Sequence, residues 1–260
     1  MLGSLLGQGR TAEVYSHGEQ ASQVVKLFYD WCGRAEVEQE CEISVAVAAS
    51  GFPAPQVGGL VQLRGRHGII YQRVAGENML QRILFSPEHH VRYARQLAAV
   101  QASMHRTRLS RLPRQRAQLI SSIRRAGLSA GTKSRVLALL DELPDGESLC
   151  HGDYHPGNVI VSNGHLTVID WANATSGHPL ADVARTSLLL TIAEIPGLGA
   201  EAERVKLWQR VFRDAYVEHY LQLTGYGRKE LERWRLPVAA ARLAENLPGE
   251  DELIQGLLSE

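Results

Sequence analysis

The sequence predicts an α+β fold, with a sheet in its N-terminal third and helices through most of the remainder. Short β-rich runs separated by glycine turns reach as far as Gly76, and one helical segment at 34–50 interrupts them. From Ser86 onward apolar residues recur at helical spacing, with Pro87 in the first turn. A β-hairpin pattern at 158–170 is the third observation, and it lies within the helical part.

The chain begins with a glycine pattern. Leu6–Val14 fits G-x-G-x-x-G-x-V, with Gly7 and Gly9 as the first two glycines and Ala12 in place of the third. A dinucleotide-binding fingerprint looks alike, but it needs a strand before it and a long helix after it, and neither is expected here. The pattern therefore favours a strand–turn–strand flap with backbone N–H groups over phosphates and Val14 against an adenine. A positive φ at Ala12 would strain this flap.

A strand, a helix and two further strands follow the flap. The apolar strand at 24–28 carries Lys26 in its middle, a position that usually indicates an edge or snorkelling lysine. The helix at 34–50 has acidic residues crowded into its first turns, where negative charge is favourable. Runs at 60–63 and 68–76 are expected to complete the sheet.

Helical periodicity dominates the rest of the chain. In the first helix of this part, Val91, Ala94, Leu97 and Ala98 share one face. The pattern predicts helices at 86–105, 112–126, 132–143, 179–194 and 200–223, and a broken helical segment at 229–258.

The predicted hairpin brings two oxygen-bearing side chains together. Its β-rich runs, 159–161 and 166–169, flank Asn163-Gly164, and Asn-Gly is the strongest short hairpin signal. Pairing the runs around this turn places Asn158 beside the last residue of the second run, next to Asp170. Amide and carboxylate oxygens are suitable Mg²⁺ ligands, so the sequence predicts a metal site at this end of the hairpin.

A polar loop leads into the hairpin. It reads His151-Gly152-Asp153-Tyr154-His155-Pro156-Gly157-Asn158, with Asp153 five positions before Asn158. This layout is typical of a phosphoryl-transfer site, in which one carboxylate orients the attacking hydroxyl while an Asn and an Asp hold Mg²⁺. The same loop could instead be a tight turn whose polar residues cap backbone groups.

The loop and the following Ile169-Asp170-Trp171 resemble the aminoglycoside phosphotransferase and choline kinase-like family, distant relatives of the protein kinases. That family has H-G-D-x-H-x-x-N and I-D-[WF] motifs, and the Asp-to-Asn spacing is that of the protein-kinase loop. The resemblance implies a two-lobed protein-kinase-like fold. A small antiparallel-sheet N-lobe with one helix, 1–74, would bind nucleotide. A larger, mostly helical C-lobe, 75–260, would hold the catalytic loop, the metal site and the acceptor site.

The resemblance also implies roles for individual residues. Asp153 would be the catalytic base, and His155 would brace its loop. Lys26 would pair with phosphates, and Glu40, or as second choice Glu42, would pair with Lys26. The Mg²⁺ ligands would be Asn158 and Asp170; Gln72 and Val74 would offer backbone groups to the adenine edge; and Asp182, in a D-x-A stretch, would anchor the catalytic loop.

Composition limits the classes of partner. The chain has 260 residues, 44% of them hydrophobic, and a formal net charge of zero, so neither nucleic acid nor membrane is an expected partner. Its three cysteines lack C-x-x-C spacing, and the sequence shows no signal segment or membrane span. We therefore expect a cytoplasmic protein, as a monomer or homodimer.

The sequence thus predicts a phosphotransferase that moves the γ-phosphoryl group of ATP, with Mg²⁺, to a hydroxyl of an aminoglycoside-, choline- or sugar-like molecule. One alternative is a catalytically silent nucleotide-binding module. Another is a metal-dependent hydrolase, since His151, Asp153 and His155 alternate as metal ligands can. The acceptor is expected against 195–260, where Trp234 and Glu245 are candidate contacts. Other aromatic and acidic residues there are Trp208, Tyr216, Tyr220, Tyr226, Glu250, Asp251 and Glu252.

Overall fold

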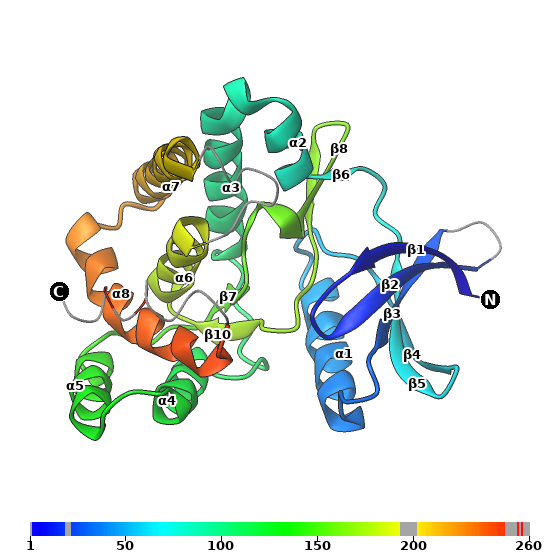
Figure 1. Ribbon diagram of the computed structural model, residues 1–260, viewed down its shortest axis with the longest axis horizontal. Coiled ribbons are helices and arrows are strands. Elements are labelled where there is room, and N and C mark those ends of the chain that lie inside the picture. Colours follow the sequence, from blue (N-terminus) through cyan, green and yellow to red (C-terminus); the bar gives the residue numbers. More distant parts are fainter. Residues whose placement is uncertain (1, 19–21, 193–201, 248–253, 255, 257–260) are drawn as a thin grey trace. The chain divides into compact units, whose positions relative to one another are not determined.

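The computed structural model describes residues 2–18, 22–192, 202–247, 254 and 256 (Figure 1). The chain packs into two compact units. The first comprises the residues up to Gln81 together with Gly157–Asn173, and the second comprises Arg82–Pro156 together with the described residues from Ala174 onward. This packing groups the hairpin with the N-terminal sheet. The expected functional division between residues 74 and 75 remains a prediction.

A five-stranded antiparallel sheet forms the centre of the first unit, in the order β1-β2-β3-β5-β4. The turn between its last two strands is Arg64-Gly65, with φ of 53° and 81°, and positive φ at both positions matches the twist of a tight hairpin. The strands are β1 (Leu2–Gln8), β2 (Ala12–His17), β3 (Gln23–Phe28), β4 (Val57–Leu63) and β5 (Arg66–Gln72).

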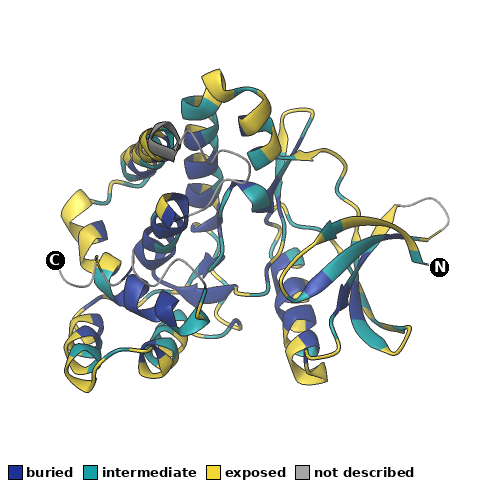
Figure 2. Cartoon of the chain, viewed as in Figure 1, coloured by how far each residue is buried: buried dark blue, intermediate teal, exposed yellow. Residues whose placement is uncertain are grey.

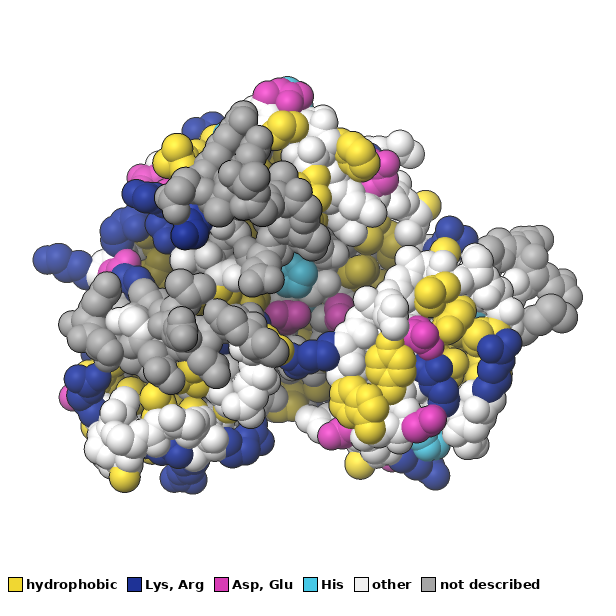
Figure 3. All heavy atoms as spheres, viewed as in Figure 1, with side chains coloured by type: hydrophobic (Ala, Val, Ile, Leu, Met, Phe, Trp, Pro, Cys, Tyr) yellow, Lys and Arg dark blue, Asp and Glu magenta, His cyan; other side chains and the backbone are white. Residues whose placement is uncertain are grey.

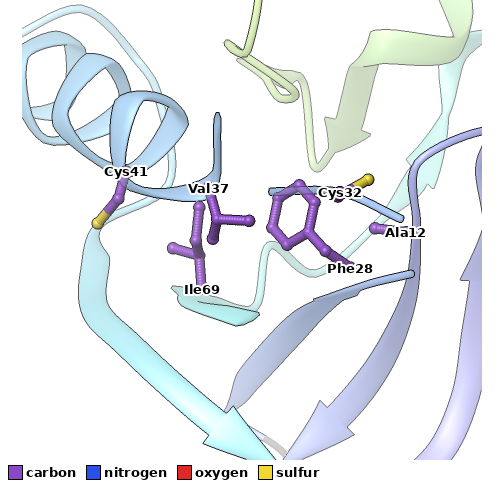
Figure 4. Packing of buried hydrophobic residues seen from close by; sticks show 6 residues of the cluster. All are labelled: Ala12, Phe28, Cys32, Val37, Cys41 and Ile69. Atoms are coloured by element: carbon purple, nitrogen blue, oxygen red, sulfur yellow. The ribbon is translucent and has the colours of Figure 1, made fainter. Parts of the chain in front are cut away.

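One helix, α1 (Arg34–Ala48), packs on this sheet. Its start is stabilised by Glu36, whose carboxylate accepts the Gly33 N–H at 3.0 Å in the manner of a capping box. Side chains from the helix, the strands and the segment between β3 and α1 then form one apolar core (Figure 4). Its buried members are Ala12, Phe28, Cys32, Val37, Cys41 and Ile69.

The predicted hairpin is confirmed. β8 (Val159–Ser162) and β9 (His165–Val168) pair from Val159–Val168 to Ser162–His165, and β6 (Glu77–Asn78) adds a third strand on the β8 side. Asn163 and Gly164 have φ of 47° and 83°, so both central residues of the turn are left-handed. The register is the one that places Asn158 opposite Ile169.

The second unit is mostly helical, and α6 (Pro179–Ile192) is its most buried helix (Figure 2). A two-stranded sheet of β7 (Ser148–Cys150) and β10 (Thr175–Gly177) lies beside it. In the described part of the chain, no helix is both long enough and apolar enough to cross a membrane. The other helices are α2 (Met79–Phe85), which contains the boundary between the units, α3 (His90–Met104), α4 (Gln115–Arg125), α5 (Ala130–Asp141), α7 (Ala202–Thr224) and α8 (Arg228–Arg242).

Some predicted boundaries were wrong. The helix expected from residue 86 begins with a 3₁₀ turn, Pro87–His89, before α3 starts. The strand expected through residue 76 ends at Gln72. Of the segment expected at 229–258, the structure describes α8 and a 3₁₀ turn, Leu243–Glu245, whereas residues 248–253, 255, 257 and 258 lie outside the described residues.

Candidate active site

Lys26 joins the sheet, the helix and the hairpin of the first unit. Its Nζ lies 2.7 Å from Glu40 Oε1 and 2.8 Å from Asp170 Oδ1. Burial of the lysine disfavours its charge, but the negative charges of Asp170 and Glu40 outweigh that cost and raise the pKa of Lys26 above its ordinary value. The side chain is therefore held as an ammonium at neutral pH.

Glu40, rather than Glu42, is the glutamate that reaches Lys26. Its side chain is 8% exposed and also accepts a hydrogen bond from the Tyr71 hydroxyl at 3.3 Å, whereas Glu42 lies on the exposed side of α1. Ser44, one turn further along the helix, lies 3.1 Å from the same hydroxyl. Sequence reasoning missed Tyr71, because a tyrosine in a strand carries no sign that its hydroxyl orients a carboxylate.

Backbone pairing at the open end of the hairpin places Asn158 opposite Ile169, the residue before Asp170. The Ile169 N–H donates to the Asn158 carbonyl at 2.9 Å, which continues the ladder one step beyond β8 and β9. Asp170 then adopts φ of 62°, a left-handed conformation that Asp tolerates better than most residues. Its side chain is 44% exposed, while Asn158 is buried. Strained backbone of this kind is concentrated at functional sites.

Two further contacts hold this segment to the loop that follows α1. The Val168 N–H donates to the Pro53 carbonyl at 3.1 Å, and the rings of Phe52 and Trp171 meet edge to face at 5.7 Å. The Trp171 indole N–H donates to Val168 O at 2.9 Å. The tryptophan of the I-D-W motif is thus a packing residue that fixes the chain on either side of Asp170.

The flap strands form a tight hairpin with Arg10 and Thr11 at its tip, since the Gly9 N–H donates to Ala12 O at 2.8 Å. Ala12 is 2% exposed and does not have a positive φ. The backbone strain that a positive φ would cause at this third glycine position is therefore absent. Neither Gly7 nor Gly9 has positive φ. A Cβ on Gly7 would meet no atom within 4 Å, and one on Gly9 would meet Ala12 O at 3.5 Å.

The two residues expected at the adenine edge, Gln72 and Val74, differ in whether the structure already uses their backbone groups. The Gln72 N–H donates to Gln56 O at 2.8 Å, so this donor is already used within the first unit. Val74 lies after the end of β5 and is half-buried. Any nucleotide contact from Gln72 must therefore come from another of its atoms, whereas the role expected of the Val74 backbone remains a prediction.

In the second unit, Asp182 holds the polar loop. Its Oδ1 accepts the Gly152 N–H at 2.7 Å and its Oδ2 accepts the His151 N–H at 3.1 Å. Gly152 has φ of 77°, which turns these two successive N–H groups toward one carboxylate. This is the anchoring contact that the D-x-A stretch implied.

Gln101 of α3 and His105, the residue that follows α3, contact Asp182, and tyrosines of α7 contact both of them. Gln101 Nε2 and His105 Nε2 lie 2.9 Å and 3.1 Å from its Oδ2. Burial alone would raise the pKa of Asp182, but the hydrogen bond and charge of His105, with the other donors, lower it to about 2. Tyr216 donates to Gln101 Oε1, and the Tyr220 hydroxyl lies 2.6 Å from His105 Nδ1. Buried polar side chains at helical spacing on two helices were the available signal for this network.

Asp153 lies on the anchored loop and is partly exposed, at 30% of its side chain. His155 Nε2 is 3.8 Å from Asp153 Oδ2, a distance that is too long for a hydrogen bond between these two atoms. Tyr154, between them, is fully buried, and its hydroxyl donates to Leu97 O at 2.9 Å. Tyr154 thus braces the loop by a direct hydrogen bond to α3, while the bracing role expected of His155 remains a prediction.

The alternating His151, Asp153 and His155 do not form a metal centre. Among the described residues, the three potential ligands that lie within reach of one ion are His105, Cys150 and Asp182, with their ligand atoms within 4.8 Å of one another. All three are buried, and the histidine and the aspartate already bond to each other. This group belongs to the network around Asp182.

The C-terminal residues expected to contact an acceptor are engaged in packing. Trp234 is 3% exposed and stacks on His178 with ring centroids 5.2 Å apart. Glu245 binds the guanidinium groups of Arg185 and Arg242 at 2.5 Å and 2.6 Å. The expectation that Trp234 lines an acceptor pocket was therefore wrong. Glu250, Asp251 and Glu252 lie outside the described residues.

Comparison with known proteins agrees with the site geometry described above. A sequence model described as the phosphotransferase enzyme family matches residues 5–234. The chain belongs to this family. The assignment confirms the resemblance drawn from the loop and the I-D-W motif, and with it the expected enzyme class, a small-molecule kinase. No curated protein sequence matches the chain.

Solved structures confirm the predicted fold. An aminoglycoside-3′-phosphotransferase of type VIII superposes with a TM-score of 0.62 at 18% identity, covering 92% of each chain. An amicoumacin kinase in complex with AMP-PNP, Ca²⁺ and Ami gives 0.64 at 14% identity, over 98% of this chain and 85% of that one. Choline kinase from Cryptosporidium parvum Iowa II gives 0.51 at 13% identity, over 99% and 91%. Family and fold together support an ATP-dependent phosphotransferase of small molecules.

Proposed function

We propose that the protein transfers the γ-phosphoryl group of Mg·ATP to a hydroxyl of a small molecule. The observation that carries the proposal is the position of Lys26, whose ammonium binds both Glu40 and Asp170 within 2.8 Å. A buried lysine between two carboxylates, one of them beside an asparagine, supplies the cation and the oxygen ligands that phosphoryl transfer requires.

The residues present fit a magnesium ion. Asn158 and Asp170 offer an amide and a carboxylate oxygen from one end of the hairpin, and Mg²⁺ is usually held by one or two such groups plus phosphates. When bound, the ion would neutralise negative charge on the phosphates. A neighbouring amicoumacin kinase was solved with AMP-PNP and Ca²⁺, which supports the use of a nucleotide together with a divalent ion.

The flap fits phosphates. Packing does not require glycine at position 7 or 9, since a Cβ at either would meet no close contact and neither φ is positive. Open space beside exposed backbone is what a phosphate group needs in order to approach the N–H groups of the turn. We therefore assign Gly7, Gly9 and Val14 to the nucleotide, as expected from their pattern.

Asp153 is assigned to the acceptor hydroxyl. It would orient the hydroxyl oxygen and accept its proton as that oxygen bonds to the γ-phosphorus, while the bond from the γ-phosphorus to the β,γ-bridging oxygen breaks and ADP leaves. Asp182 supports this role indirectly, because its carboxylate fixes the two peptide N–H groups immediately before Asp153. Lys26 would stabilise the charge on the phosphates during transfer.

The acceptor proposed here is a hydroxyl-bearing small molecule of the aminoglycoside, choline or sugar kind. Structural neighbours include an aminoglycoside phosphotransferase in complex with ADP and streptomycin, and a macrolide 2′-phosphotransferase. Glu245 adds little to a cationic preference, because Arg185 and Arg242 already neutralise its charge.

The test is a panel of candidate alcohols incubated with [γ-³²P]ATP and Mg²⁺, each with a no-acceptor control. Radiolabel in an acceptor-dependent product supports the proposal. Nucleotide binding by calorimetry without any labelled product across the panel would favour the silent binding module. Release of free phosphate that is independent of every acceptor, or hydrolysis supported by tightly bound zinc, would favour the hydrolase instead.

A further inference from the structure

Tyr29, immediately after β3, contacts the turn between β1 and β2. Its N–H donates to the Thr11 carbonyl at 3.0 Å, and its hydroxyl accepts a hydrogen bond from Gln8 Nε2 at 2.9 Å. The hydroxyl also lies 3.5 Å from Gly9 O, at the long end for a hydrogen bond. Tyr29 thus touches both sides of the tip of the flap. Residues 7–11, which include Gly7 and Gly9, are called the glycine-rich turn below.

The ring of Tyr29 is itself held in place. The Arg66 guanidinium lies 5.2 Å from the ring centroid and donates to Phe28 O and Leu27 O at 2.6 Å and 2.8 Å. The same guanidinium donates to Glu13 Oε2, in the second flap strand, at 2.8 Å. Arg66 thereby connects β5, the end of β3 and β2 at the point where Tyr29 leaves the sheet.

Packing does not account for the hydroxyl of Tyr29. The residue is half-buried, and Trp31 stacks on it with ring centroids 6.4 Å apart while remaining 67% exposed. Figure 3 shows hydrophobic side chains gathered on the surface of the first unit over its N-terminal strands. A phenylalanine would make the same ring contacts but would lack the hydroxyl, which contacts Gln8 and Gly9 of the glycine-rich turn.

We propose that Tyr29 is a positioning residue that holds the glycine-rich turn ready for the nucleotide phosphates, which rests on the function proposed above. Gly7 and Gly9 give this hairpin unusual backbone freedom, and ordering such a backbone upon binding costs affinity. A side chain that fixes the turn before the nucleotide arrives reduces that cost. Tyr29 contributes to nucleotide affinity in this way without contacting the reacting atoms.

The first arm of the test is independent of the nucleotide. Tyr29→Phe removes the hydroxyl and keeps the ring, so the fold should persist. Tyr93→Phe, at a half-buried tyrosine of α3 in the other unit, is the matched control. In nucleotide-free protein we expect amide hydrogen exchange at residues 9–12 to accelerate several-fold, roughly threefold to tenfold, in Tyr29→Phe alone. Unchanged exchange would overturn the proposal.

The second arm measures nucleotide affinity by calorimetry with Mg·AMP-PNP. Tyr29→Phe should weaken binding by about threefold to tenfold, with an unchanged acceptor KM once an acceptor is known. Equal affinities of wild type and Tyr29→Phe would contradict the proposal. If wild-type protein binds no nucleotide, the function proposed above fails, while the exchange measurement still decides whether Tyr29 holds the turn.

Discussion

Asp170 Oδ1 lies 2.8 Å from Lys26 Nζ, so the carboxylate proposed to hold Mg²⁺ is paired with the ammonium proposed to hold phosphate. The two residues are 144 positions apart in the sequence and come from the hairpin and the sheet of one compact unit. Glu40 gives the ammonium a second carboxylate. If Asp170 bound a metal ion, its ion pair with Lys26 would weaken. The Lys26 ammonium would then keep its ion pair with Glu40.

Replacing Asp170 by alanine should weaken binding of Mg·ATP by at least tenfold and change the affinity for metal-free ATP much less. The loss of one carboxylate removes a direct ligand from an ion that relies on one or two protein oxygens. Calorimetric titration with and without Mg²⁺ measures both affinities. Asp30→Ala, at an exposed aspartate of the same unit, is the control. Equal losses in both titrations would leave Asp170 with a structural role only.

Glu40 should act on the nucleotide through Lys26. Glu40→Gln keeps the shape of the side chain but removes its charge, and we expect nucleotide affinity to fall about tenfold, which corresponds to about 1.4 kcal/mol. In a Lys26→Met background the same change should have little further effect, because the ammonium through which Glu40 acts is then absent. A double-mutant cycle measures this coupling between two residues in contact. Glu42→Gln, at the exposed neighbour two positions on, should behave as wild type. Additive losses in the double variant would show that Glu40 acts independently of Lys26.

The hairpin and its register could be predicted from sequence because local chemistry determines them. Asn163-Gly164 fixes the turn, and the side-chain alternation then fixes which residue faces Asn158. The choice of Glu40 was harder, since four glutamates share the start of one helix. It depended on the family resemblance and not on any property of the helix alone.

The parts that sequence reasoning missed depend on long-range packing. Tyr154 and Tyr71 appear in the sequence as ordinary aromatic residues, yet their hydroxyls bond to Leu97 O and to Glu40. Trp234 was assigned to the acceptor because aromatic residues are common in pockets, but burial against His178 decides its role. No local pattern distinguishes a buried aromatic residue from one that lines a pocket.

Asp153→Asn should bind nucleotide as wild type does and transfer phosphoryl groups about 10² to 10⁴ times more slowly. An amide of the same shape cannot accept the hydroxyl proton, and general acid–base groups contribute rate factors of this size. Turnover on an identified acceptor and nucleotide affinity by calorimetry are the two measurements. Turnover near that of the wild type would remove Asp153 from the assigned role, and lost nucleotide affinity would point to a disturbed loop.

Asp182 should make stability depend on pH. Its folded-state pKa is lowered from 3.8 to about 2, which corresponds to about 2 kcal/mol of stabilisation by the charged carboxylate. Because the folded-state pKa is the lower one, this contribution is fully present well above pH 3.8 and is lost as the pH falls toward 2. Asp182→Asn should therefore be less stable than wild type at pH 7, and the difference should shrink between about pH 5 and pH 3.

Urea unfolding of both proteins at pH 7, 5, 4 and 3 measures that difference. Glu218→Gln is the matched control, because this glutamate on α7 is 63% exposed and its pair with Arg228 is a surface contact of little weight. The control should stay close to wild type at every pH. A difference between Asp182→Asn and wild type that is constant from pH 7 to pH 3 would mean that lost packing, and not the charge of Asp182, destabilises the variant. If the difference narrows as expected, the stabilisation comes from the carboxylate charge, which His105, Gln101 and the loop N–H groups hold in place.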